Sequence, residues 1–268
     1  KEKTDGVPLF VEELTRMVLE SGLLREEDGY YSHDGPIQEL EIPSTLKDSL
    51  ISRLDRLHTA KDLAYMGAVL GRVFPFELLQ AVSGRTQASL EPDLKQLIDA
   101  ELLYQRGVIP QATFMFKHAL VQDTAYDSLL AHKRAALHQK VARVLEENFP
   151  DVLDKKPEIM AHHLTEAGLH RQAVLLWEKA GKQAAYRFSS SETVHHLQKG
   201  LDLLEGIDDD DFRREKEVDL LAILTPIIQL TYGFTETEKM NQRWLEAAKA
   251  TQNVSKIHDA YIGQFTYL

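Results

Sequence analysis

The stretch RQAVLLWEKAGKQAAYRFSSSETVHHLQKG, residues 171–200, decides how the second half of this chain folds. Apolar residues recur in it at the spacing of an α-helix, and the serines at 189–191 separate two such segments. Each segment carries a small-large-small series: Ala173, Trp177 and Ala180 in the first, Thr193, Leu197 and Gly200 in the second. Any tightly packed pair of helices needs this pattern. The stretch therefore predicts a hairpin of two helices.

Helical periodicity continues on both sides of this hairpin, from about His132 to the end of the chain, without a strand signal. When Trp177 is aligned with the large aromatic position of a tetratricopeptide repeat, Gly181 falls on the glycine position of that repeat without a gap. We therefore expect residues 132–268 to form a tetratricopeptide-like helical array that is truncated at its C-terminus. Pro226 lies inside an apolar helical run and is expected to kink or split it.

Residues 43–131 carry a different pattern, in which helices are followed by two short β-prone runs. Leucines at 46, 50, 54 and 57 form one helical stripe, and FELLQAVSG reads as a short helix that Gly84 caps. SLEPDLKQLIDAEL reads as a further helix with a proline in its first turn. The runs LLYQRG and ATFMFK then read as strands before the helix HALVQDTAYDSLL. Three helices followed by a two-stranded ribbon predict a winged-helix domain.

Residues 1–42 predict a helix and a small hairpin or loop. Pro8 suits a first helical turn, and apolar residues recur after it at spacings of three and four. Asp28-Gly29 and Asp34-Gly35 are turn signals beside strand-like pieces around Tyr30-Tyr31 and Leu40–Ile42. The fold class expected for the whole chain is therefore mainly α, with a small β-hairpin wing in its middle part.

Composition narrows the classes of function. The chain has 268 residues, no cysteine and a net charge of −11, and it contains neither a signal peptide nor an apolar run near twenty residues. These features predict a cytoplasmic location without membrane contact, and the acidic balance disfavours sequence-blind binding to nucleic acid. Because the chain lacks an initial methionine and ends without a helix stop, it is expected to be a fragment of a longer protein.

Neither a metal site nor a catalytic site is expected from the sequence. Neighbouring residues on a helix point about 100° apart, so the pairs His162-His163 and His195-His196 cannot chelate an ion from one face. The acidic stretch EGIDDDDF lacks the ligand spacing of a calcium loop and reads as a solvated linker. The chain contains no P-loop, no nucleophile elbow and no paired-carboxylate signature. We therefore predict that this chain is not itself an enzyme and holds no metal.

A winged helix suggests DNA binding, which the charge pattern disfavours. The helix that would enter the major groove carries Glu91, Asp93, Asp99 and Glu101 against Lys95. A helix that reads bases needs Lys, Arg, Asn or Gln on that face. Basic and acidic residues also nearly balance over residues 46–129, so no basic patch is expected. A winged helix that contacts protein is the favoured interpretation.

Two short stretches are candidates for contact with a nucleotide. Gly6-Val7-Pro8 opens the first helix, and Phe116-Lys117-His118 joins the second strand of the ribbon to the following helix. A helix N-terminus presents free N–H groups, and an imidazole or ammonium group beside it adds donors for an anion. The alternative remains open that the first stretch is only a turn and that His118 only caps its helix.

These residues resemble a known family. The blocks TDGVPLFVEELTRMVLESGLL, IPSTLKDSLISRLDRL, GAVLGRVFPFELLQAVSG, ATFMFKHALVQDTAYDSLL and IMAHHLTEAGLHRQAV are similar to the signal-transduction NTPases called STAND proteins. The resemblance is to the bacterial branch that joins a class III nucleotide cyclase or a transcription-factor domain to an AAA-like ATPase and tetratricopeptide repeats. It extends over essentially the whole chain.

The resemblance implies roles for the candidate residues. Gly6 and Pro8 match the element that opens the helical lid after the P-loop core, where the proline packs against adenine. His118 matches the histidine that reaches the β-phosphate of ADP and holds the closed state, with Lys117 beside it. The acidic third position of that motif is Ala119 here, which removes a carboxylate contact. The P-loop lysine and the Walker B carboxylates have no counterpart, so ADP or ATP with Mg²⁺ is expected to bind only in the full-length parent.

The function implied is regulation within a multidomain ATPase. ADP would bridge the NTPase core of the same polypeptide to residues 1–42 and 43–131, and exchange for ATP would release His118 and free the repeats. The repeats would then act as a sensor that binds a protein or peptide. A nucleotide cyclase is the expected effector. The alternatives are a transcriptional regulator of the same architecture and a free-standing repeat scaffold that never meets nucleotide.

Overall fold

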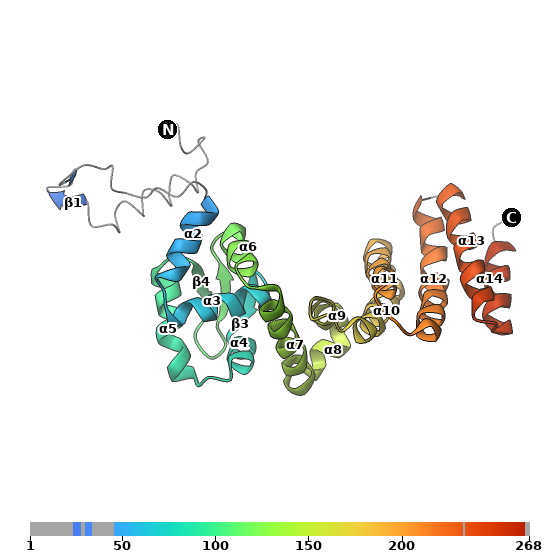
Figure 1. The fold of residues 1–268 in the computed structure, drawn as a ribbon, viewed down its shortest axis with the longest axis horizontal. Coiled ribbons are helices and arrows are strands. Elements are labelled where there is room, and N and C mark those ends of the chain that lie inside the picture. Colours follow the sequence, from blue (N-terminus) through green and yellow to red (C-terminus); the bar gives the residue numbers. More distant parts are fainter. Residues whose placement is uncertain (1–23, 28–29, 34–45, 233, 266–268) are drawn as a thin grey trace. The chain divides into compact units, whose positions relative to one another are not determined.

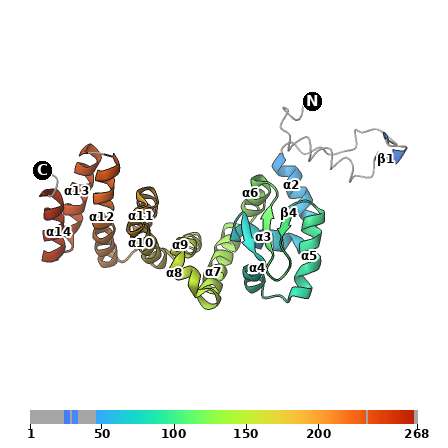
Figure 2. The same cartoon turned by 180° about the vertical axis from the view of Figure 1, so that it is seen from behind.

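The computed structural model describes residues 24–27, 30–33, 46–232 and 234–265. The chain is mainly α-helical, as the sequence predicted, and contains a small three-stranded antiparallel sheet. It divides into two compact units, residues 1–131 and residues 132–268, which are described in turn. Figures 1 and 2 show the elements of each unit from opposite sides.

The first described elements are two short paired strands. Strand β1 (Leu24–Glu27) runs antiparallel to β2 (Tyr30–His33), and Leu24 pairs with His33. The sequence predicted a strand-like piece around Tyr30-Tyr31, which this pairing confirms. The second predicted piece, Leu40–Ile42, and the helix predicted from Pro8 lie outside the described residues.

In the described part of the first unit five helices follow: α2 (Leu46–Asp55), α3 (Thr59–Leu70), α4 (Phe76–Ser83), α5 (Gln87–Asp99) and α6 (Ala119–Asp127). The predicted leucine stripe is buried at Leu50, Leu54 and Leu57. Gly84 ends α4 in the left-handed conformation with φ 72°, as predicted for a glycine cap. Helix α5 begins at Gln87, earlier than predicted, so Pro92 lies inside it and not in its first turn.

The sheet has three strands, one more than the sequence predicted. The two predicted strands, β4 (Leu103–Arg106) and β5 (Thr113–Phe116), pair antiparallel. Strand β3 (Val73–Pro75) adds to the other edge of β5, which gives the order β3-β5-β4. Strand β3 has only three residues and leads directly into α4, so its alternation was too short to detect.

Four phenylalanines form the centre of this unit, and each is fully buried: Phe74, Phe76, Phe114 and Phe116. The ring centroids of Phe74 and Phe114 lie 6.1 Å apart. Gly67 on α3 gives these rings their space, because a β-carbon there would lie 2.8 Å from Cζ of Phe74. The sheet and α3 are therefore held together by aromatic packing.

The second unit is helical throughout its described residues. Its helices are α7 (Ala131–Asn148), α8 (Pro150–Lys155), α9 (Pro157–Glu166), α10 (His170–Tyr186), α11 (Ser190–Leu204), α12 (Asp210–Tyr232), α13 (Phe234–Ala250) and α14 (Val254–Phe265). Helices that follow one another from α9 to α14 pack side by side, as the ribbons in Figures 1 and 2 show. Helix α8 was not predicted, since six residues carry too little periodicity to be recognised.

The quoted stretch forms the predicted hairpin of α10 and α11. Trp177 packs in a core with Ala161, Leu164 and Ala173, which joins α10 to α9. A second core farther along the chain contains Trp244 from α13 together with side chains of α11 and α12. Each tryptophan of the unit therefore belongs to its own hydrophobic core.

Pro226 does not split its helix. Helix α12 runs unbroken from Asp210 to Tyr232 with Pro226 inside it, so the expectation of a break is wrong. A proline inside a helix costs about 3 kcal/mol through the lost hydrogen bond and steric clash. Helix α12 packs between α11 and α13, and Leu220, Leu221 and Leu224 are fully buried. This burial outweighs the local cost.

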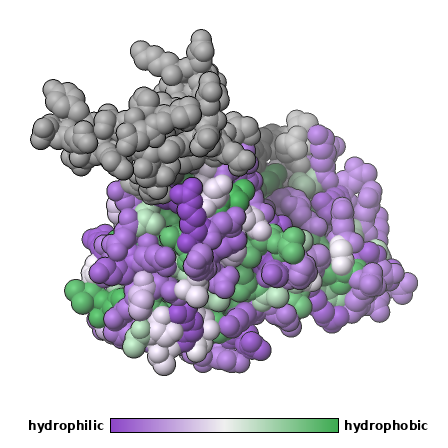
Figure 3. Space-filling model, turned by 60° about the vertical axis from the view of Figure 1, so that its left-hand side comes forward, coloured by the Kyte–Doolittle hydropathy of each residue, from purple (hydrophilic) through white to green (hydrophobic). Residues whose placement is uncertain are grey.

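No helix among the described residues is long and apolar enough to cross a bilayer. On the face shown in Figure 3, hydrophobic side chains are interspersed among hydrophilic ones.

Candidate functional site

The first candidate site lies at the junction between β5 and α6. His118 precedes α6 in extended conformation, and its carbonyl accepts a hydrogen bond from the Val121 amide at 3.1 Å. Its side chain makes no capping hydrogen bond, which argues against the alternative that His118 only caps its helix. The imidazole is partly buried, and its Nε2 atom is buried without a hydrogen-bond partner among the described residues. A buried polar atom left unpaired in this way costs about 1–3 kcal/mol.

Lys117, the second candidate at this junction, is held by neighbouring residues. Its backbone N–H donates to the Leu102 carbonyl at 3.0 Å, and its Nζ lies 2.8 Å from Oε2 of Glu101. An incoming phosphate would have to compete with the Glu101 carboxylate for this ammonium group. His118 is therefore the better-placed donor of the two. Gly6 and Pro8 lie outside the described residues, so their predicted contact with a nucleotide stays a prediction.

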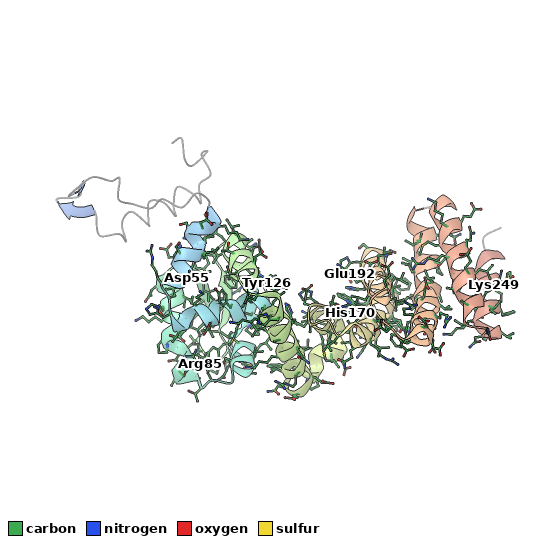
Figure 4. All side chains as sticks on the ribbon, viewed as in Figure 1. Asp55, Arg85, Tyr126, His170, Glu192 and Lys249 are labelled. Atoms are coloured by element: carbon green, nitrogen blue, oxygen red, sulfur yellow. The ribbon has the colours of Figure 1, made fainter. Side chains whose placement is uncertain are left out.

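Helix α5 tests the DNA-binding alternative. Asp93 points into the unit, where it accepts a hydrogen bond from Thr59 at 2.9 Å and pairs with Arg85 at 2.8 Å. Figure 4 labels Arg85, which lies between α4 and α5. The charged residues that remain exposed on α5 are Glu91, Lys95 and Asp99. One cation between two carboxylates makes a poor match to the phosphates and base edges of a major groove.

The turn between α10 and α11 exposes two aromatic rings. Tyr186 is 87% exposed and Phe188 is 94% exposed. A hollow of about 580 Å³ lies near this turn, lined by Lys155, Lys156, Glu158, Arg187, Ser189, Glu192 and His196. Glu192, labelled in Figure 4, lies 3.5 Å from Arg187. Exposed aromatic rings beside a charged hollow are features of protein-binding surfaces.

Three histidines from two helices meet within the second unit. His138 comes from α7, and His162 and His163 come from α9. The Nδ1 atoms of His138 and His163 lie 2.9 Å apart. One ligand nitrogen from each of the three rings lies within 4.8 Å of the others. His138 and His163 are buried, whereas His162 is exposed.

The surroundings keep these imidazoles neutral. Burial lowers the pKa of His138 to about 4, with a further lowering by His162 and Arg134 and an opposing effect of Glu166. Burial likewise lowers the pKa of His163 to about 3, helped by the charges of His138 and His162. The pKa of His162 is also lowered, first because the neighbouring side chains partly desolvate its ring although the residue as a whole is exposed, and then by Lys199, against Glu166. Neutral imidazole is the form that binds a metal ion.

Sequence reasoning missed this cluster. From the sequence, His162-His163 was considered as a neighbouring pair on its own. The third histidine, His138, lies on another helix, 25 positions before His163. The second neighbouring pair differs, since His196 stacks on the Trp177 ring with centroids 5.5 Å apart. A usable signal was the spacing of four between His162 and Glu166, which places both side chains on one side of α9.

Comparison with known proteins gives one distant relative. No family model matches the chain. The chain is similar to the uncharacterized protein R02095 of Rhizobium meliloti (strain 1021), with 28% identity over 235 residues. The match covers 86% of this chain and 22% of that protein. The chain thus spans about a fifth of the length of the relative it matches.

Proposed function

We propose that this chain is the regulatory and sensor region of a multidomain signalling ATPase. In this proposal residues 43–131 sense whether a P-loop core in the same polypeptide holds ADP or ATP. Residues 132–268 bind a protein or peptide partner, and a nucleotide cyclase is the effector under control. The chain itself carries no catalytic step.

The order of elements in the first unit supports a winged helix. Helix α3 is followed by β3, then by α4 and α5, and then by the ribbon of β4 and β5, with β5 central in the sheet. This is the order in which a winged helix builds its three helices and its wing. The exposed charges of α5 disfavour DNA as its ligand, so a contact with protein is the better interpretation.

His118 is the observation that carries the proposal. Its Nε2 atom is buried at the start of a helix and has no partner among the described residues. An imidazole nitrogen in this position can donate to an anion, and the helix N-terminus adds a favourable field for negative charge. The β-phosphate of ADP held by a neighbouring core would supply the missing partner. ATP would then shift the population to the open state if it binds that state better.

The second unit supports the sensor role. Its successive packed helices build an extended surface of the kind that repeat proteins use for binding. Tyr186 and Phe188 project from this surface beside the charged hollow at the turn of α10 and α11. Aromatic anchors surrounded by charged residues suit a protein or peptide partner. The match to a relative about four times as long also agrees with a module of a larger protein.

Calorimetry with ADP and ATP tests the proposal. The titrations would use this chain and a form extended N-terminally through the expected P-loop core, each with and without His118→Ala. We expect only the extended form to bind. His118→Ala should weaken the affinity for ADP by about 10- to 150-fold and leave the affinity for ATP nearly unchanged, because one charge-assisted hydrogen bond contributes about 1.5–3 kcal/mol.

His132→Ala is the matched control, since His132 is an exposed histidine at the start of α7. It should leave both affinities unchanged. If the extended form binds ADP equally well with alanine at position 118, the first unit is a spacer. The repeat scaffold would then be the better description of the chain.

A further inference from the structure

We propose that His138, His162 and His163 form a binding site for a divalent transition-metal ion, with Zn²⁺ as the expected occupant. The site would tie α7 to α9 at the start of the second unit. His138 precedes His162 by 24 positions and His163 by 25 positions, yet one ligand nitrogen of each ring lies within 4.8 Å of the others.

The positions of the nitrogens suit a small metal ion. Zinc binds imidazole nitrogen at about 2.0–2.1 Å, so two ligands of a tetrahedral site lie about 3.4 Å apart. The Nδ1 atoms of His138 and His163 are 2.9 Å apart, which is slightly closer than this edge. The ligand nitrogen of His162 has to move closer to the other two, and this exposed side chain has the room to turn.

The donor set selects the class of metal. Three imidazoles suit Zn²⁺, Cu²⁺ or Ni²⁺, whereas Mg²⁺ and Ca²⁺ prefer carboxylate and carbonyl oxygens. The fourth position is open to water or to a carboxylate. Glu166 lies four residues after His162 on α9, and its charge acts on both His138 and His162. This carboxylate therefore offers an anionic partner for the bound cation.

The direct contact of His138 with His163 is the competing explanation. Without a metal ion, one Nδ1 must carry a proton and donate it to the other. With a metal ion, both Nδ1 atoms offer lone pairs to the ion and each proton sits on Nε2. The exposed His162 distinguishes the two cases, because a hydrogen bond between the buried pair does not need it and a three-ligand site does.

A metal ion here would have a structural effect on the first helix of the unit. Helix α7 meets α9 through Ala142, which belongs to the core around Met160 and Ala161. A coordination bond from His138 would add a link between α7 and α9. Metal binding should therefore raise the stability of the second unit, and the gain should grow with the logarithm of the free metal concentration.

The test is a metal titration of the whole chain after treatment with EDTA. Co²⁺ is the spectroscopic probe, because its visible bands report four-coordinate nitrogen ligation, and Zn²⁺ should displace it. We expect about one equivalent per chain and at least about tenfold weaker binding in His162→Ala. The control His195→Ala removes an exposed histidine of the other neighbouring pair and should bind like the unaltered chain.

Thermal unfolding supplies a second readout. Zn²⁺ should raise the melting temperature of the unaltered chain and of His195→Ala, and it should not raise that of His162→Ala. Because His162 is exposed, its replacement leaves the buried pair and the fold in place. The proposal is overturned if the unaltered chain shows no cobalt bands, or if His162→Ala binds Co²⁺ as tightly as His195→Ala does.

Discussion

Leu197 occupies the space that a side chain at residue 181 would need. A β-carbon built on Gly181 would lie 2.6 Å from Cγ of Leu197, a separation that β-carbons essentially never show. The two residues belong to α10 and α11, so the glycine sets how closely these helices approach. Gly200 on α11 faces Leu220 in the same way but with more room, at 3.2 Å.

The first prediction concerns this close approach. Gly181→Ala should lower the free energy of unfolding of the second unit by up to about 2 kcal/mol, because overpacking costs about 1–3 kcal/mol and the helix-propensity gain offsets only about 1 kcal/mol. Gly200→Ala should have a smaller effect, since Leu220 can yield by a few tenths of an ångström. Urea unfolding followed by circular dichroism measures both. Equal stability of the two variants would contradict the role given to Leu197.

The second prediction concerns His118 in a full-length parent protein. His118→Ala should raise basal output and shorten the retention of ADP, because it removes a contact that the proposed closed state makes and the open state lacks. His132→Ala should change neither quantity. The measurements are effector activity without a stimulus and the rate of ADP release. Unchanged values for both in His118→Ala would refute the proposed switch.

The third prediction concerns pH in the metal-free chain. His138 and His163 have pKa values of about 4 and about 3 in the folded state, while an unfolded histidine titrates near 6.5. The unfolded chain therefore binds more protons between these values, so stability falls as pH drops from about 6.5 toward 4. The slope is at most about 1.4 kcal/mol per pH unit for each group.

Urea unfolding in EDTA at a series of pH values measures this slope. His163→Leu should make it shallower, because that variant removes one of the two groups. His132→Ala should keep the slope, since His132 is exposed. If the free energy of unfolding stays constant from pH 6.5 to 4.5, neither buried imidazole takes up a proton on unfolding.

The fourth prediction concerns a charged network that joins three helices. Glu178 on α10 is 6% exposed and pairs with Lys216 on α12 at 2.9 Å. Lys216 also pairs with Asp219 at 3.1 Å, and Asp219 pairs with Lys256 of α14 at 2.7 Å. Burial lowers the pKa of Lys216, but its bonds to Glu178 and Asp219 outweigh this effect and raise that pKa above its usual value.

Lys216→Met should therefore lower the free energy of unfolding by about 1–3 kcal/mol, because Glu178 loses a partner in a buried position. Adding Glu178→Gln should restore part of this loss, so the double variant is less than additive. Lys155→Met, which breaks the surface pair with Asp151, should leave the stability unchanged. Additive losses in the double variant would mean that the two residues act independently.

Much of the helical architecture could be predicted from local sequence. Gly84 was recognised as a cap, and Trp177 with Gly181 marked the hairpin of α10 and α11, because helical spacing and cap chemistry are local properties. Strand β3 and helix α8 were missed because three and six residues carry little periodicity. The possible split at Pro226 was wrong, because the packing of α12 against its neighbours is not visible in the local sequence.

The candidate sites were less predictable than the fold. His118 was selected from its place at a strand-to-helix junction, but its burial and the pairing of Lys117 with Glu101 depend on tertiary packing. The approach of His138 to His163 depends on the register between α7 and α9, which no spacing along one helix encodes. Such sites require the three-dimensional arrangement of the helices.

The placement of the two tryptophans has a practical consequence. Trp177 and Trp244 lie in separate cores of residues 132–268, and residues 1–131 contain no tryptophan. Emission excited selectively from indole therefore reports on the second unit alone, while the first, whose central rings are phenylalanines, unfolds without changing it. Indole emission combined with a probe of total helix content would separate the two unfolding transitions in one untagged sample.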